Sequence, residues 1–321
     1  MTTFIKTRPR LAGVLSILAL SGTAVYLTQK TLNKTCPRVP INQVSSLSAC
    51  RNFVESGEPA AQKPWGTEKS VLLSTWLGGE GKSVWMPSFV ALQVDIPIAL
   101  IGNYAIGKKG TRMKEEENET GGGGYHLVQN LVTAFLDARA KGLEAWFLDR
   151  NVPPMSFNPG SRLFGRGKEF GAFMLDSWDS GPELHSQLDT TRGLPADAPH
   201  PASAFPSNEY TIADNLSGSE TAGTAIYWNF PACLVSAVNK ASSYGLPWRL
   251  MDGGFQEFIV ERVSDEMARV TYVTLECSDL HPGGLESRDY KKVPWVMYEL
   301  HVFYAQVLLW KTVRLLKRRG E

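Results

Sequence analysis

The chain is poor in the residue patterns that mark most metal-binding and hydrolytic proteins. Its 321 residues include only 4 cysteines and 5 histidines. No C-x-x-C pair occurs, and no two histidines lie within four residues of each other. These absences exclude zinc ribbons, thioredoxin motifs and the H-x-x-x-H metal pair, so we expect no metal site. The G-x-S-x-G turn of the α/β-hydrolases is also missing.

Nucleotide-binding motifs are missing too. Gly81-Lys82-Ser83 resembles the end of a phosphate-binding loop, but Trp76 stands where that loop needs its first glycine. Gly165, Gly167 and Gly171 do not have the spacing of a dinucleotide fingerprint. We therefore expect no cofactor.

The chain also has almost no excess charge. Lys and Arg total 33 and Asp and Glu total 32, a net charge of +1. No global field attracts nucleic acid, so we expect no nucleic-acid partner. With 43% hydrophobic residues the composition is that of a folded protein rather than a disordered one.

One long uncharged run stands near the N-terminus, at residues 11–28, after a basic start. As a helix, at about 1.5 Å per residue, it nearly spans a hydrocarbon core of about 30 Å. A cleaved signal peptide with Gly22 and Ala24 before the cut, and a buried helix of the folded body, are the alternatives. Because the apolar character continues through Leu27, we favour a retained signal-anchor at 1–30 and a single-pass membrane protein.

Cysteines and glycosylation sequons bear on the compartment. Four cysteines permit two disulfides in three possible pairings, and the alternative is that all four thiols are reduced. N-x-[ST] sequons occur at Asn33, Asn118 and Asn215. Together with the anchor they favour an endomembrane location with a lumenal body.

Composition divides the remainder of the chain. Residues 31–70 are polar and rich in Pro, Ser and Lys, which predicts a stalk. Residues 71–321 read as a single α+β domain with a long polar insertion at 179–223. Apolar periodicity predicts four strands and one central helix in the first part of this domain: Val71–Leu77, Ser88–Ile101, Phe170–Trp178 and Thr224–Phe230, and the helix Tyr125–Arg150.

The clearest elements lie near the C-terminus. Phe255–Val263 and Met267–Cys277 are rich in β-branched and aromatic residues and flank a polar turn, which predicts a hairpin. The last predicted helix, Pro294–Arg318, is apolar nearly all round. Such a helix is either buried or in a membrane, and three polar residues in its middle favour a helix clasped by a sheet over a second span.

Those polar residues are Glu299, His301 and Gln306. In one interpretation they reach an internal cavity; in the other they form the solvent edge of the helix. A carboxylate in apolar surroundings has a raised pKa and can act as an acid or base, and imidazole titrates near neutrality. We therefore choose Glu299 and His301 as candidate catalytic residues, and Tyr298, Tyr304 and Gln306 as candidate substrate-binding residues.

Two segments carry a resemblance to a known superfamily. The stretch from Gly253 to Glu261 with the strand to Cys277, and the helix segment from His301 to Leu309, resemble the helix-grip (START-like, polyketide-cyclase-like) proteins. The resemblance implies an antiparallel sheet wrapped on the long C-terminal helix around an apolar cavity. It implies binding of apolar small molecules, sometimes with cyclisation or isomerisation in specialised metabolism, and it transfers no residue role.

The resulting expectation is a membrane-tethered cyclase or isomerase acting on a hydrophobic small molecule. A non-catalytic carrier of a lipid or sterol is the alternative, and a membrane-anchored interaction module is a third hypothesis.

Overall fold

The computed structural model shows an α+β fold with one antiparallel sheet and a long C-terminal helix. Six strands pair in the order β1-β6-β5-β4-β3-β2. The described residues are 27–55, 84–104, 123–142, 157, 161–166, 170–179, 221–246, 249–279 and 294–320. Residues 1–26 of the expected anchor, and the expected strand Val71–Leu77, lie outside them.

The strands are β1 (Val84–Pro97), β2 (Arg162–Arg166), β3 (Phe170–Asp179), β4 (Thr221–Asn229), β5 (Gly253–Arg262) and β6 (Met267–Asp279). The predicted strands in β1, β3 and β4 are confirmed with shifted ends. β1 stops at Pro97, where the short helix α5 (Ile98–Gly102) begins. β4 starts at Thr221, so the last residues of the expected insertion belong to the sheet.

The predicted hairpin is confirmed in β5 and β6. Phe258 pairs with Tyr272 near its centre, and both side chains are buried. Their rings stack with centroids 5.0 Å apart. β-branched and aromatic residues pack well on a pleated surface, which explains why the local pattern was sufficient here.

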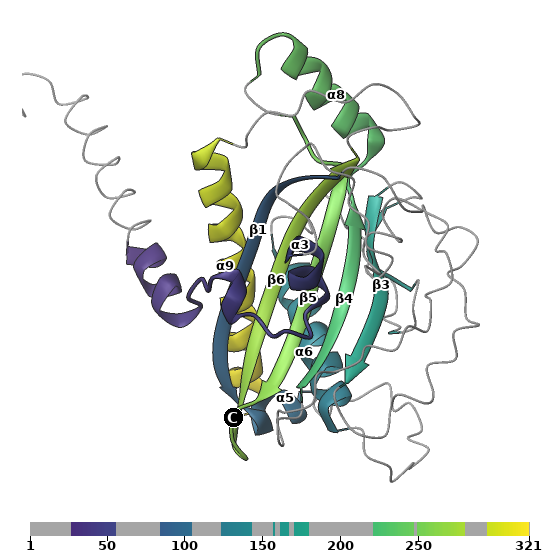
Figure 1. The fold of residues 1–321 in the computed structure, drawn as a ribbon. Coiled ribbons are helices and arrows are strands. Elements are labelled where there is room, and N and C mark those ends of the chain that lie inside the picture. Colours follow the sequence, from purple (N-terminus) through teal and green to yellow (C-terminus); the bar gives the residue numbers. More distant parts are fainter. Residues whose placement is uncertain are drawn as a thin grey trace, which may run out of the picture.

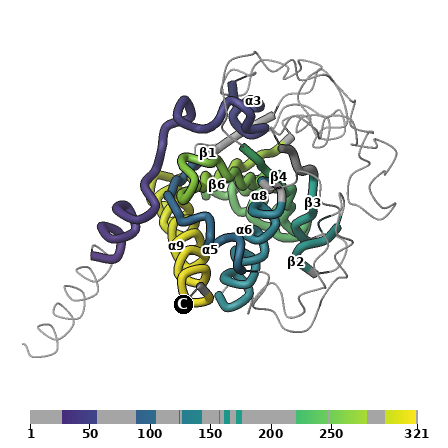
Figure 2. The backbone as a smooth tube through the Cα atoms, turned by 90° about the horizontal axis from the view of Figure 1, so that it is seen from below, coloured from purple at the N-terminus to yellow at the C-terminus, as the bar shows by residue number. Residues whose placement is uncertain are grey.

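Helices and the N-terminal segment cover opposite faces of the sheet. α5, α6 (Gly123–Ala140) and α9 (Trp295–Gly320) lie on one side, and α3 (Ala49–Glu55) lies on the other (Figure 2). We call the side of α6 and α9 the inner face and the side of α3 the outer face. Because strand side chains alternate, Phe258 contributes to the inner core and Phe255 to the outer core.

α6 covers the part of the inner face nearest to α5. Its Phe135 ring lies 4.8 Å from Phe258 and 5.1 Å from Tyr272 between centroids. α6 ends at Ala140, and residues 143–150 of the helix predicted to reach Arg150 lie outside the described residues. The N–H of Gly142 donates to the Arg139 carbonyl at 2.8 Å in a turn that closes the helix.

α9 packs against α6 and also touches β1 and α5. It runs from the α8 end of the molecule to the α5 end (Figure 1). The helix α8 (Ala232–Ser243), which follows β4, was not predicted. No helix among the described residues combines the length and apolar character needed to cross a bilayer.

The expected polar stalk differs from the structure over residues 31–55. This segment forms a helix over residues 27–35, the 3-10 turn η1 (Ile41–Gln43) and α3. Val39 is not part of an exposed linker. Its N–H donates to the Ala91 carbonyl at 3.0 Å, so this segment covers the edge strand β1. Cys50 and Phe53 are fully buried against the outer face. A few apolar side chains in a polar stretch are enough to dock it.

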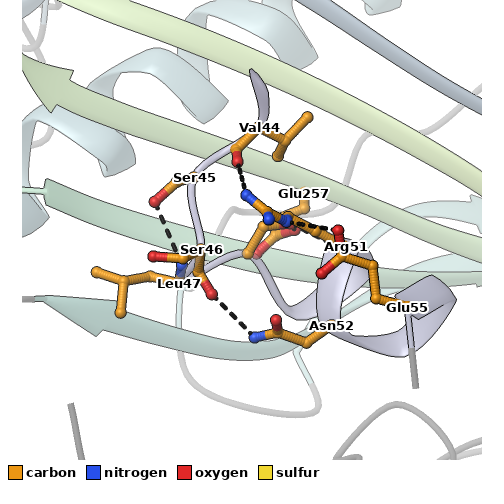
Figure 3. A network of polar contacts seen from close by, with 9 residues as sticks. Val44, Ser45, Ser46, Leu47, Arg51, Asn52, Glu55 and Glu257 are labelled. Atoms are coloured by element: carbon orange, nitrogen blue, oxygen red, sulfur yellow. Dashed lines mark hydrogen bonds and ion pairs between the residues drawn. The ribbon is translucent and has the colours of Figure 1, made fainter. Parts of the chain in front are cut away.

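A buried carboxylate completes this docking. Glu257 of β5 accepts hydrogen bonds from Ser48 Oγ at 2.5 Å, Ala49 N at 2.8 Å and Cys50 N at 3.1 Å, all at the start of α3. Burial raises the pKa of Glu257, and these three donors oppose the rise. Figure 3 shows Glu257 beside this segment. There Arg51 donates hydrogen bonds both to the Val44 carbonyl and to the Glu55 carboxylate. Glu257 therefore serves as a cap supplied from a distant strand.

All four cysteines are free thiols, so the structure contains no disulfide among its described residues. Cys36, Cys50 and Cys277 are buried, and Cys233 is exposed.

Candidate functional site

The inner face of β6 changes from apolar to polar along its length. Near α5 it presents Ala268, Val270 and Tyr272, and near α8 it presents Thr274, Glu276 and Ser278; all six are buried. A row of polar side chains on a buried face needs partners, because an unpaired buried polar group is costly. The α8 end of the inner face is therefore the candidate site.

Strand register brings four residues into one row across this end. Ser88 of β1 pairs with Glu276, Glu276 pairs with Gly254 of β5, and Gly254 pairs with Trp228 of β4. Two strand spacings place the backbones of Glu276 and Trp228 about 10 Å apart. Gln256 lies two residues along β5 from Gly254, on the same face.

His301 of α9 contacts this row at Glu276, from the helix side of the inner face. Its Nδ1 lies 3.1 Å from Glu276 Oε1, and Ser88 Oγ donates to Glu276 Oε2 at 2.7 Å. Both carboxylate oxygens of Glu276 are thereby engaged, and the residue is only 7% exposed. When Nδ1 carries the proton directed at Glu276, the neutral ring keeps a lone pair on Nε2. Glu276 thus orients the ring as a carboxylate orients a catalytic histidine.

Three polar atoms of this region are buried without a hydrogen-bond partner within the described part of the chain. They are His301 Nε2, Trp228 Nε1 and Gln256 Oε1. Isolated cases of this kind are uncommon in folded proteins, and each calls for an explanation. The three atoms are a proton-accepting nitrogen, a donor and an acceptor, and they come from α9, β4 and β5 at the α8 end of the inner face.

Gly254 holds the Trp228 ring close to this row. A Cβ on Gly254 would meet the Leu275 carbonyl oxygen at 2.0 Å and Trp228 Cζ2 at 2.9 Å. Only glycine allows this approach. The indole also packs against Phe230, whose ring lies edge-on at 5.1 Å between centroids. The indole N–H is therefore held in place by packing.

The two candidate catalytic residues from the sequence have different surroundings. Glu299 forms an ion pair with Arg38 and its side chain is 24% exposed. Two residues of a helix differ by about 200° in direction, so Glu299 and His301 point to different sides of α9. The structure brings His301, and not Glu299, to Glu276.

The three candidate binding residues are also spread around α9. Tyr298 donates through its hydroxyl to the Phe89 carbonyl at 3.4 Å, and Tyr304 is 41% exposed. Gln306 is buried and donates to Asn33 Oδ1 at 2.8 Å and to the Cys36 carbonyl at 3.0 Å. In this arrangement Gln306 ties the N-terminal segment to the terminal helix.

Of the three sequon asparagines, Asn33 is exposed and accepts the hydrogen bond from Gln306, while Asn118 and Asn215 lie outside the described residues. The described ranges contain no group of three or more His, Cys, Asp or Glu side chains arranged to hold a metal ion.

Sequence reasoning missed Glu276, Trp228 and Gln256. One signal was present: in β6 the polar residues Thr274, Glu276 and Ser278 alternate with the apolar residues Val273, Leu275 and Cys277. A charged residue in the middle of a buried strand is rarely left without a role. The partners of Glu276 could not be read in the same way, because Ser88 and His301 come from distant parts of the chain.

Comparison of the chain with protein-family models, with curated proteins and with solved structures found no match.

Proposed function

We propose that the protein is a proton-transfer enzyme, an isomerase or cyclase, that acts on a hydrophobic small molecule at the α8 end of the inner face. The observation that carries the proposal is the orientation of His301: Nδ1 faces Glu276, and Nε2 is buried with no partner in the described residues. A base held in this way can take a proton from a substrate without first breaking a bond within the protein.

The chemistry needs no external reagent. Nε2 removes a proton from a carbon next to a carbonyl, or from a hydroxyl, and the resulting imidazolium is stabilised by Glu276. The Trp228 N–H donates to the oxygen on which negative charge develops. Return of the same proton from Nε2 to a different atom gives an isomer. If the newly formed nucleophile instead attacks another atom of the same substrate molecule, return of the proton from Nε2 gives a cyclic product.

The surroundings favour a largely apolar substrate. Trp228 and Met251 belong to the inner core, and Phe157, Phe230 and Leu250 pack against it. Apolar walls exclude water and strengthen the few polar contacts that remain. A membrane tether at residues 11–28 fits a substrate that partitions into lipid, and we include it in the proposal.

The test is metabolite profiling of a deletion strain of the source organism. Isomerisation and simple cyclisation conserve mass, so the enzyme predicts a pair of isomeric compounds: the product is lost on deletion and its isomer accumulates. The wild-type gene should restore the product, whereas His301→Ala should not. Trp228→Phe keeps an aromatic ring but removes the indole N–H, and it should restore only part of the product.

Glu299→Gln is the matched control, because it alters a polar residue of the same helix turn that is paired at the surface. It should restore the product fully. If His301→Ala folds and restores the product as well as the wild type does, the proposal is wrong. An apolar compound that copurifies with both proteins, without any isomer pair, would instead support the carrier alternative.

A further inference from the structure

The side of α9 that faces away from the sheet carries an uninterrupted apolar surface. Val296, Leu300 and Tyr304 are spaced by four residues and are 58%, 55% and 41% exposed. Trp295 and Met297 add exposures of 73% and 43% at the start of the helix. Large apolar side chains gathered in this way on a surface usually mark a contact with a membrane or another protein.

The same stripe becomes basic in the second half of the helix. A spacing of three or four residues leads from Tyr304 through Val307 to Lys311, Arg314 and Arg318, which continues one face of the helix. Arg314 and Arg318 are exposed. Glu299 is the only acidic residue in the helix sequence, and Arg38 neutralises it. The outward face therefore combines an apolar half with a cationic half.

The N-terminal segment emerges beside this face. Figures 1 and 2 both show the helix over residues 27–35 on the side of α9 opposite to α6. Gln306 ties this helix to α9 through Asn33. Leu27, the first described residue of this helix, is 55% exposed and lies near the end of the uncharged run at 11–28, and Lys30 and Lys34 are exposed further along.

We propose that this outward face of α9 lies on the surface of an anionic membrane, with the apolar half among the acyl chains near the interface and the basic half on the headgroups. An amphipathic helix binds a bilayer in this way, and each basic residue near an anionic surface contributes about 1 kcal/mol. The uncharged run ends at the edge of this face, which favours lipid over a second protein as its occupant. The docked helix would hold the α8 end of the sheet at a constant height above the bilayer.

This inference does not depend on catalysis, and its test uses no substrate. The full chain with Cys233→Ser, which removes the exposed thiol, is reconstituted into phosphatidylcholine vesicles with and without phosphatidylserine. A fluorophore is attached to Leu300→Cys, or, as a control, to Val263→Cys in the β5–β6 turn, which is similarly exposed at 50%. Quenching is measured with lipids that carry a nitroxide on the acyl chain.

Docking predicts strong quenching at residue 300 in vesicles with phosphatidylserine, and little quenching at residue 263. Arg314→Glu with Arg318→Glu should shift the ratio of docked to undocked protein by about 30-fold or more, since about 1 kcal/mol per residue corresponds to about fivefold. The matched control, Lys240→Glu with Arg262→Glu, makes the same charge change away from α9 and should leave the quenching unchanged.

Equal quenching at residues 300 and 263 would overturn the proposal. So would a fluorophore at residue 300 that is shielded from an aqueous quencher but not reached by the lipid quencher, because that result means that another protein copy covers the face. Neither result would bear on His301, so this proposal and the proposed function fail independently.

Discussion

Nδ1 of His301 lies 3.1 Å from Oε1 of Glu276, and this contact joins the terminal helix α9 to β6, the strand next to the β1 edge of the sheet. Ser88 holds the other carboxylate oxygen, so three elements meet at one buried carboxylate. The contact sets which ring nitrogen of His301 faces the protein and which is left for a ligand.

The first prediction concerns the tautomer of His301. Because Glu276 accepts from Nδ1, the neutral ring should carry its proton on Nδ1 and leave Nε2 unprotonated. Long-range nitrogen–proton NMR correlations report this directly, and the exposed His126 on α6 is an internal reference. Glu276→Ala should remove the preference. A wild-type spectrum with the proton on Nε2 would contradict the assigned role of Glu276.

The second prediction concerns Gly254. Gly254→Ala should destabilise the protein by about 1–3 kcal/mol, since the new Cβ collides with the backbone oxygen of Leu275, which cannot turn aside. Urea denaturation measures the loss. Gly102→Ala is the control: its Cβ meets nothing closer than Leu127 Cδ2 at 4.0 Å. That variant should be neutral or more stable by about 0.4–1 kcal/mol. Similar losses in both would mean that crowding at Gly254 is not the cause.

The third prediction is a pH dependence of stability that arises from Glu257. Burial raises the pKa of this carboxyl in the folded state, so the folded protein binds the proton more tightly than the unfolded chain does. The contribution of Glu257 to stability is therefore greatest at low pH. It falls as the pH rises from about 4.3, the ordinary glutamate value, to the raised value in the folded state.

Glu257→Gln cannot ionise, so the free energy of unfolding of the wild type relative to this variant should decrease across that interval. Denaturation of both proteins at successive pH values measures the difference. Ser48→Ala removes a donor that favours the ionised form, so it should raise the pKa of Glu257 further and extend the decrease to higher pH. A difference that grows with pH would show that the carboxyl has a lowered pKa instead.

The fourth prediction concerns thiol reactivity. Cys233 is exposed and should react at once with a thiol reagent, while Cys36, Cys50 and Cys277 should react only after unfolding or local opening. Burial raises the pKa of Cys36 to about 12, which further suppresses its thiolate. Gln306→Ala removes the hydrogen bond to the Cys36 carbonyl. It should therefore speed labelling of Cys36 while leaving Cys277 unaffected, as mass spectrometry of the labelled peptides would show.

The hairpin and the terminal helix illustrate what the sequence determined by itself. β-branched and aromatic residues on both sides of a polar turn predicted β5 and β6, and a segment that is apolar nearly all round predicted α9. These patterns depend on residues a few positions apart, which is the range over which strand and helix periodicity act. His301 was a candidate on the same basis, as a polar residue on an apolar helix.

Only the tertiary structure decided which of those polar residues meet. Glu276 and His301 are brought together by the packing of α9 beside β1 and β6, and Glu299 is drawn to Arg38, which lies 261 residues away in the chain. The same holds for Glu257 and Ser48, 209 residues apart. Such pairs are set by strand register and by the docking of whole elements, to which a local pattern contributes nothing. For this reason the sequence of residues 31–55 predicted an exposed polar stalk. In the structure a few buried side chains and the carboxylate of Glu257 hold this segment on the sheet.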